Sequence, residues 1–209
     1  MAKISAFEKH RDRYEEWFEE HGPLYEEELR ALRRLLPPFE KGVEIGVGTG
    51  RFAEPLGIKE GVEPSPKMAE VAKARGIEVA QGVAEALPLR SESYDLALMV
   101  TTICFVDDPR EALREIYRIL KPGGHVLLGF VDKETPLGHL YQKNREKSRF
   151  YREATFYSTR EVLELLKEAG FGDCEAAQTL FGPDLEHMEG GVKEGYGQGA
   201  FVAVRCQKP

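Results

Sequence analysis

The chain has 209 residues, of which 42% are hydrophobic and 31% charged, and this balance predicts one globular domain with a substantial core. A formal net charge of −7 disfavours nucleic acid and anionic membranes as partners. No apolar run approaches the roughly 18 residues of a membrane span, and charged residues follow the N-terminus where a signal peptide would be apolar, so we expect a cytoplasmic protein.

Two amphipathic helices are predicted before the first strand. Aromatic residues from Phe7 to Phe18 lie on one face of the first helix, and leucines define the second, which ends at Pro37-Pro38. Aromatic stripes at helical spacing usually face a core, so packing is the simpler role of this pair. The alternative is a cap over a ligand cleft, with Tyr14 or Trp17 contacting the ligand.

An apolar run beginning at Val43 leads into three alternating glycines, Gly46, Gly48 and Gly50. The pattern predicts a buried strand, a tight turn and then a short helix broken at Pro55. Glycine allows the backbone to take positive φ and to approach a ligand closely, and a helix starting there would direct free N–H groups to the same place. An ordinary strand-to-helix turn has the same pattern, so the glycines alone leave ligand binding open.

Further strands alternate with helices up to residue 131. Apolar runs at 58–63, 77–80, 95–100 and 125–131 are separated by helices that open at Ser65-Pro66 and Asp108-Pro109, which offer an N-cap followed by proline. This alternation predicts a parallel α/β sheet. Residues 132–157 form a polar, aromatic insertion. A helix opened by a capping box at Ser158 follows, and the runs 175–181 and 200–206 predict an antiparallel pair at the sheet edge.

Cys104, Cys174 and Cys206 are odd in number, far apart and without C-x-x-C spacing. Neither a disulfide framework nor a zinc site is therefore expected, and a reducing compartment fits best. A single Asn among many Glu, Lys and Arg is a composition typical of heat-adapted proteins.

Several motifs in order resemble the class I S-adenosylmethionine-dependent methyltransferases: the glycine turn, the acid Glu63 at the end of the second strand, the segment 82–88, and the strand 95–100 before Asp108-Pro109. The small-molecule branch that includes quinone-biosynthesis methyltransferases is the most similar. The resemblance implies a Rossmann-like three-layer α/β sandwich with a seven-stranded mixed sheet whose last strand is antiparallel. It implies a single methyltransferase domain over 1–209, with an N-terminal helical cap at 1–36 and an insertion near the active site at 132–157.

The resemblance also implies a binding site for S-adenosylmethionine. Glu44 would hold the methionine amino group, directly or through water, and Glu63 would accept hydrogen bonds from both ribose hydroxyls. Relatives often carry an acid where Val83 stands and His where Phe105 stands, so the adenine amino contact and a general base are not assigned. No catalytic residue and no metal ligand is expected. The expected cofactor-binding residues are Tyr14, Glu44, Gly46, Val47, Gly48, Gly50, Glu63, Pro64, Ser65, Met68, Ala84, Glu85, Thr101 and Thr102.

The implied function is methyl transfer to a small-molecule acceptor, achieved mainly by in-line positioning, in a monomer or homodimer without nucleic acid or membrane partners. Tyr14 and Trp17, the insertion residue Tyr141 and the loop around Tyr196 are expected to cover the acceptor pocket. His139 is a candidate base, although a lone loop histidine more often faces solvent.

Two alternatives to the methyltransferase remain open. One is a cofactor-binding module without catalysis. The other is a nicotinamide-dependent oxidoreductase, whose fingerprint requires Gly or Ala at the position of Arg51.

Overall fold

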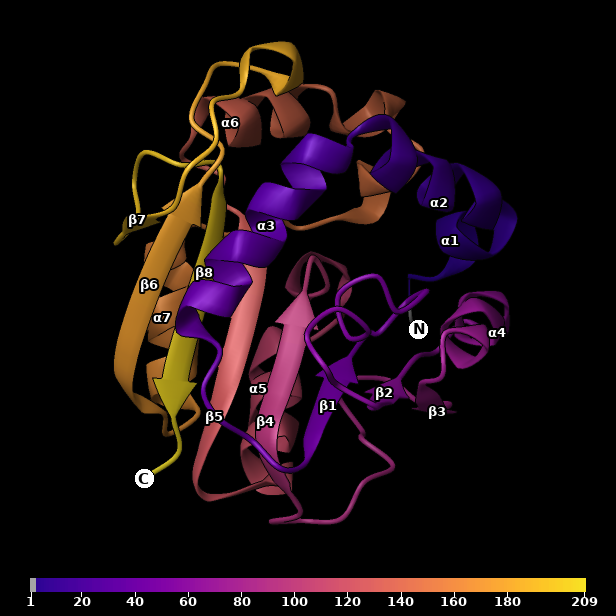
Figure 1. Cartoon of the computed structure of the whole chain (residues 1–209), viewed down its shortest axis with the longest axis vertical. Coiled ribbons are helices and arrows are strands. Elements are labelled where there is room, and N and C mark those ends of the chain that lie inside the picture. The colour runs from indigo at the N-terminus through magenta and orange to yellow at the C-terminus, as the bar shows by residue number, and fades with distance from the viewer. Residues whose placement is uncertain (1–2) are drawn as a thin grey trace.

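A mixed sheet with the strand order β3-β2-β1-β4-β5-β8-β6-β7 forms the centre of the computed structural model, which describes residues 3–209 (Figure 1). The first five strands of this order pair in parallel, and β8 runs antiparallel between β5 and β6. The predicted fold class is therefore confirmed. The eight strands are β1 (Gly42–Ile45), β2 (Glu60–Val62), β3 (Glu78–Ala80), β4 (Tyr94–Val100), β5 (Leu120–Val131), β6 (Gly172–Thr179), β7 (Lys193–Glu194) and β8 (Phe201–Gln207).

Helices cover both faces of the sheet. In Figure 1, α3 crosses in front of β5 and β8, whereas α5 and α7 lie behind the sheet, and α1, α2 and α6 gather beyond the carboxyl ends of the parallel strands. Within residues 3–209, no helix is both long and apolar enough to cross a membrane. The helices are α1 (Ser5–Lys9), α2 (Arg11–Glu20), α3 (Gly22–Leu35), α4 (Pro66–Ala74), α5 (Pro109–Ile119), α6 (Pro136–Lys143) and α7 (Thr159–Glu168).

Strand β4 shows why the central strands are apolar almost throughout. Leu96 and Leu98 belong to the core on the α3 side, whereas Ala97 and Met99 belong to the core on the α5 and α7 side. Successive side chains of a strand point to opposite faces, so a strand covered on both faces buries every residue. This central position agrees with the prediction for 95–100.

The N-terminal segment and the glycine turn differ from the predicted elements. Three helices precede β1 instead of two, because the backbone breaks at His10 as well as near Gly22. Residues 51–57 form turns, not a helix, since Pro55 has no N–H and Gly57 takes a positive φ of 75°. No helix N-terminus therefore lies directly after the glycines.

The antiparallel pair of β6 and β8 was predicted correctly, but its place in the sheet was not. β8 lies inside the sheet, hydrogen-bonded to both β5 and β6, and the edge is formed by the two-residue strand β7. β7 also raises the strand number above the expected seven. A run of two residues carries no periodicity from which a strand could be predicted.

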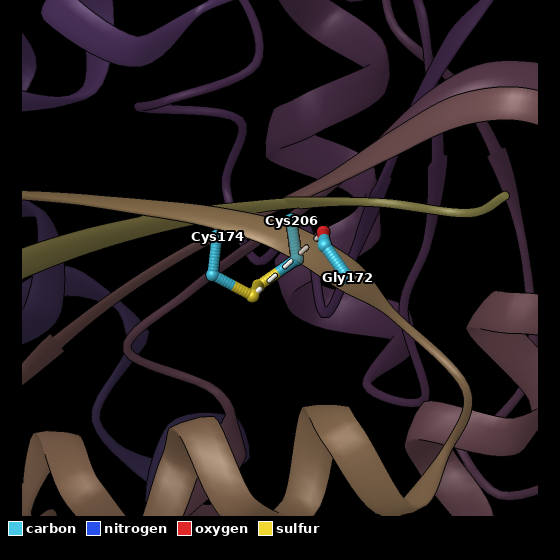
Figure 2. The surroundings of a disulfide bond; sticks show 3 residues. All are labelled: Gly172, Cys174 and Cys206. Atoms are coloured by element: carbon cyan, nitrogen blue, oxygen red, sulfur yellow. Dashed lines mark hydrogen bonds between the residues drawn. A yellow bond between two sulfur atoms is a disulfide. The ribbon is translucent and has the colours of Figure 1, made fainter.

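The expectation that the cysteines form no disulfide is wrong. Cys174 in β6 and Cys206 in β8 are bonded across the two neighbouring strands (Figure 2). The register explains the contact, because Glu175 pairs with Arg205 and the preceding cysteine therefore faces Cys206. The two residues are 32 positions apart in sequence, so their spacing gave no sign of the bond. Cys104 is free, as expected, and it is buried.

Candidate active site

The carboxyl ends of β1, β2, β4 and β5 open into a cavity of about 230 Å³. Residues of α1, α2, α3 and α6 close it on the side away from the sheet. Its wall is mainly aromatic and aliphatic, and a smaller set of charged side chains interrupts it: Lys3, Arg13, Glu28, Glu63, Glu85 and Asp107. In open α/β sheets this edge is where ligands bind.

The glycine turn after β1 lies directly against the end of β4. Gly46 has a φ of 72°, and a Cβ added to it would lie 2.4 Å from the Thr102 methyl carbon. Only glycine allows such an approach of backbone to side chain. The neighbouring residue Thr101 also has a positive φ, 49°, and its N–H donates to the Gly129 carbonyl at 2.7 Å. The glycine turn and the carboxyl end of β4 are thus tightly packed against each other, and both line the cavity.

Glu63 at the end of β2 is buried, with 7% of its surface exposed. One carboxylate oxygen accepts a hydrogen bond from the Gly48 N–H at 2.8 Å, and the other accepts from the Ser65 N–H at 2.9 Å. Burial raises the pKa of Glu63, and the two N–H donors oppose this rise. Glu63 is therefore not a solvated loop acid, because the turn holds its carboxylate at the cavity wall.

Glu44 in β1 is 1% exposed, and its Oε2 has no hydrogen-bond partner among the described residues. Burial is the main reason why the pKa of Glu44 is raised well above its usual range, and the nearby Glu63 charge adds to the effect. A buried polar atom without a partner is costly in a folded protein. Such an atom beside the glycine turn fits an additional polar group supplied by a ligand or by water.

Ten of the fourteen predicted cofactor residues line the cavity, and four do not. Val47 packs against Gly61, where an added Cβ would lie 2.6 Å from a valine methyl carbon, and Gly50 packs against Ile77. Ser65 accepts from the Met68 N–H as the N-cap of α4. Glu44 lies within β1 and is the fourth. The lining residues are Tyr14, Gly46, Gly48, Glu63, Pro64, Met68, Ala84, Glu85, Thr101 and Thr102.

Some of the other residues considered in the sequence analysis line the cavity, and others do not. Trp17 and Tyr141 line the cavity, and so does Val83, whose side chain accepts no hydrogen bond. Tyr196 is 42% exposed and lies outside the cavity wall, so its predicted place was wrong. The segment between β6 and β7 reaches the cavity through Leu180 and Leu185 instead. The candidate base His139 is not part of the lining.

Sequence reasoning missed a charged residue of the wall, Glu28 in α3. It also missed Tyr151, whose ring stacks against Tyr141 and Phe105 at centroid distances of 5.1 and 5.9 Å. Glu28 lies four residues from Leu24 and Leu32, at helical spacing on an apolar face, and this spacing was the available signal. Tyr151 lies in an irregular segment and had no such signal.

Comparison with known proteins identifies this arrangement. A family model described as a methyltransferase domain matches residues 43–128. A Thermotoga maritima protein, named an S-adenosylmethionine-dependent methyltransferase and possible histamine N-methyltransferase, is 55% identical, and each chain covers 98% of the other with a TM-score of 0.93. The chain belongs to the S-adenosylmethionine-dependent methyltransferases. An uncharacterized Methanocaldococcus jannaschii protein is 42% identical over 98% of this chain and 100% of its own length.

A more distant structure shares only the fold. Phosphoethanolamine N-methyltransferase 2 of Haemonchus contortus, solved with S-adenosylmethionine, is 19% identical with a TM-score of 0.64, and the match covers 88% of this chain and 52% of that one. The protein is thus a methyltransferase with S-adenosylmethionine as its cofactor, and the two alternatives, a non-catalytic module and a nicotinamide oxidoreductase, are set aside. The source of the Thermotoga protein is a thermophile, which agrees with the heat-adapted composition.

Proposed function

We propose that this methyltransferase acts on a small-molecule acceptor held in the aromatic cavity, and that it works mainly by positioning. The cavity itself carries the proposal, since a recess of about 230 Å³ walled by Tyr, Trp and Phe side chains suits a compact ligand better than a polymer. When bound, S-adenosylmethionine supplies a methyl group that is already activated on a sulfonium. The chain therefore has to align the acceptor and exclude water.

The buried polar groups fit this cofactor. We assign Glu63 to the ribose hydroxyls, because its carboxylate is held in place at the cavity wall by two backbone N–H groups. The free Oε2 of Glu44 suits the methionine amino group through a bridging water, since Glu44 itself does not line the cavity. Pro64 and Met68 on one side and Ala84 on the other would lie along the adenine.

We further propose a cytoplasmic monomer or homodimer without a nucleic-acid partner. The chain carries a net charge of −7, whereas a nucleic-acid groove would be basic. The disulfide is compatible with this location in heat-adapted organisms, whose intracellular proteins can be rich in disulfides. The resemblance to the quinone-biosynthesis branch of the family, which the sequence analysis noted, stays a prediction.

The decisive experiment is a screen of methyl acceptors that measures S-adenosylhomocysteine formation. Small amines, thiols, phenols and carbon acids form one set, and RNA, DNA and an unfolded protein form the other. We expect turnover with at least one small molecule and none with the polymers. Stoichiometric methylation of a polymer, with no small-molecule turnover, would contradict the proposal.

A further inference from the structure

Glu28 is a buried carboxyl group that the proposed function has not used. It lies in α3, is 8% exposed, and lines the cavity. Its side chain forms no hydrogen bond or ion pair with any residue between 3 and 209. The preceding residue Glu27 is different, since it accepts from the Gly191 N–H and pairs with Arg30. Glu28 thus lines the cavity without a partner, whereas Glu27 is bound to other parts of the protein by a hydrogen bond and an ion pair.

This placement is unfavourable for the ligand-free protein. A carboxylate taken out of water without a partner costs several kcal/mol unless it becomes neutral. Burial accordingly raises the pKa of Glu28 from its ordinary value of 4.5 to about 8. A leucine at this position would continue the apolar face formed with Leu24 and Leu32. An acidic side chain that lines a cavity without a partner in the protein indicates a ligand that can pair with its charged form.

Aromatic side chains line the same cavity as this carboxyl group. The phenols of Tyr14, Tyr141 and Tyr151 all lie within electrostatic range of Glu28, and the rings of Tyr141 and Tyr151 stack at a centroid distance of 5.1 Å. A carboxyl group in a cavity walled by aromatic rings is a combination that binds organic cations, because both a negative charge and ring faces attract them. These phenols themselves stay neutral, since burial raises the pKa of each one.

Most other charged groups of the wall already have partners. Arg13 forms ion pairs with Glu16 and Glu20 at 3.1 and 2.8 Å. Glu63 accepts two backbone N–H groups, and Glu85 accepts from the Asp107 and Asp108 N–H groups. Their charges are therefore compensated within the protein. Glu28 differs from these three residues in having none of these contacts, which the wall residue Lys3 also lacks among residues 3–209.

We propose that Glu28 binds the protonated amino group of a small amine acceptor and then removes its proton. This inference rests on the proposed function and names the acceptor class. The N–H bond breaks, its electron pair stays on nitrogen as the lone pair that an acceptor needs, and the proton forms an O–H bond with the Glu28 carboxylate. The proton passes to solvent when the product leaves. A carboxyl group with a raised pKa is suited to this exchange with an ammonium ion.

The test compares Glu28→Gln with Glu26→Gln, an equal change of charge at an exposed position of the same helix. The probes are 2-phenylethylamine and a set of shorter alkylamines, each paired with the alcohol of the same carbon skeleton. Binding to the protein saturated with S-adenosylhomocysteine is measured by calorimetry at pH 7.5. S-adenosylhomocysteine is titrated separately into each variant, with circular dichroism as the control for folding.

We expect at least one amine to bind the parent tenfold or more tightly than its paired alcohol. Glu28→Gln should weaken that amine at least tenfold, should change alcohol binding less than twofold, and should leave S-adenosylhomocysteine affinity within twofold. Glu26→Gln should match the parent throughout.

Three binding results would overturn the inference. One is that no amine binds more tightly than its alcohol, and another is that amine binding is unchanged in Glu28→Gln. The third is an equal loss of S-adenosylhomocysteine affinity, which would assign Glu28 to the cofactor's own amino group. Methylation of a neutral small molecule independent of Glu28 would refute this inference and leave the proposed function intact. Methylation of polymers alone would refute the proposed function.

Discussion

At the scale of single residues, Glu63 gives the most direct test of the cofactor site. Its carboxylate lies at the cavity wall, and each hydrogen bond from a ribose hydroxyl to a charged group contributes about 1.5–3 kcal/mol. The loss of one such bond in Glu63→Ala should therefore weaken S-adenosylmethionine binding roughly 10-fold to 150-fold, as measured by calorimetric titration. S-adenosylhomocysteine should lose affinity by a similar factor, because it carries the same ribose.

Glu78→Ala is the matched control, since Glu78 is an exposed acid on the neighbouring strand β3. It should bind both ligands like the parent. NAD should bind none of the three proteins. Unchanged S-adenosylmethionine affinity in Glu63→Ala would show that the ribose is held elsewhere.

Glu28 leads to a prediction about stability and pH. Its pKa of about 8 in the folded protein is above the ordinary value of 4.5, so between these two values the unfolded chain binds fewer protons than the folded one. The contribution of Glu28 to folding stability is present below pH 4.5 and is lost as the pH rises towards 8, by about 1.4 kcal/mol for each pH unit. Thermal unfolding of ligand-free Glu28→Gln should therefore show a gain in melting temperature over the parent that grows from pH 5 to pH 8.

The phenols facing Glu28 from α2, α6 and the segment around Tyr151 stay neutral over this range, since the pKa of each is raised. These phenols therefore do not contribute to the change of stability with pH in this range. Glu26→Gln should show no pH-dependent difference from the parent. A constant offset between Glu28→Gln and the parent at every pH would mean that Glu28 is ionised in the ligand-free protein.

The two acids also show what a sequence can reveal about a site. Glu63 was predictable because a glycine turn followed by an acid at the end of the next strand is a spacing that many nucleotide-binding sheets share. Glu28 has helical spacing to Leu24 and Leu32, but it also follows two other glutamates, and that run of acids resembles a solvated helix face. Its burial depends on which way α3 packs against the sheet and the cap, and that orientation is a long-range property.

At the scale of elements, the turn after β1 is a precise fit that one methyl group would disturb. Gly46→Ala places a Cβ 2.4 Å from the Thr102 methyl carbon, and the residue also has a φ of 72°. Gly57→Ala is the matched control, because its φ of 75° imposes the same backbone strain while nothing lies within 4 Å of the new Cβ. Both should lose about 1 kcal/mol of folding stability from the backbone alone.

Only Gly46→Ala should also displace the end of β4 at the cavity. We expect its S-adenosylmethionine affinity to fall at least tenfold by calorimetry, with Gly57→Ala within twofold of the parent. Equal affinities of the two variants would show that the contact between the turn and Thr102 does not position the cofactor.

Elements with strong local signals were the predictable ones. Ser65, Asp108 and Ser158 each accept a backbone N–H as N-caps, and Ser158 forms the full capping box with Glu161. The turns at 51–57 were mistaken for a helix because the four residues before Pro55 are all compatible with a helix. Strand β7 is defined by its antiparallel pairing with β6. A pairing of only two residues leaves no hydrophobic pattern in the sequence from which a strand could be predicted.

At the scale of the whole molecule, the cavity is assembled from distant parts of the chain. Its wall combines residues from the N-terminal helices, the ends of β1, β2, β4 and β5, the segment after α6, and the connection from β6 to β7. The α/β class follows from alternating periodicities, which are local. The position of β8 between β5 and β6, and the closure of the cavity by parts of the chain that are far apart in sequence, depend on packing that no local pattern encodes.

The disulfide belongs to this scale too, because it joins two strands at the end of the sheet away from the cavity. Cys206 is the second-last residue of β8 and pairs with Val126 in β5, whereas the cavity lies beyond the Val131 end of that strand. Closing a loop between positions 32 residues apart should contribute about 2–4 kcal/mol to folding. Cys174→Ser should lower the melting temperature by roughly 4–16 °C and leave S-adenosylmethionine affinity unchanged.

Reductant provides the internal control for this last prediction. It should lower the melting temperature of the parent to that of Cys174→Ser and should not change the variant, because the variant has no bond left to reduce. Thiol titration of the denatured, unreduced parent should count one free thiol, from Cys104, since the other two cysteines are bonded. Three free thiols in protein purified without reductant, or a parent melting temperature that ignores reductant, would show that the two strands are held by their hydrogen bonds and packing alone.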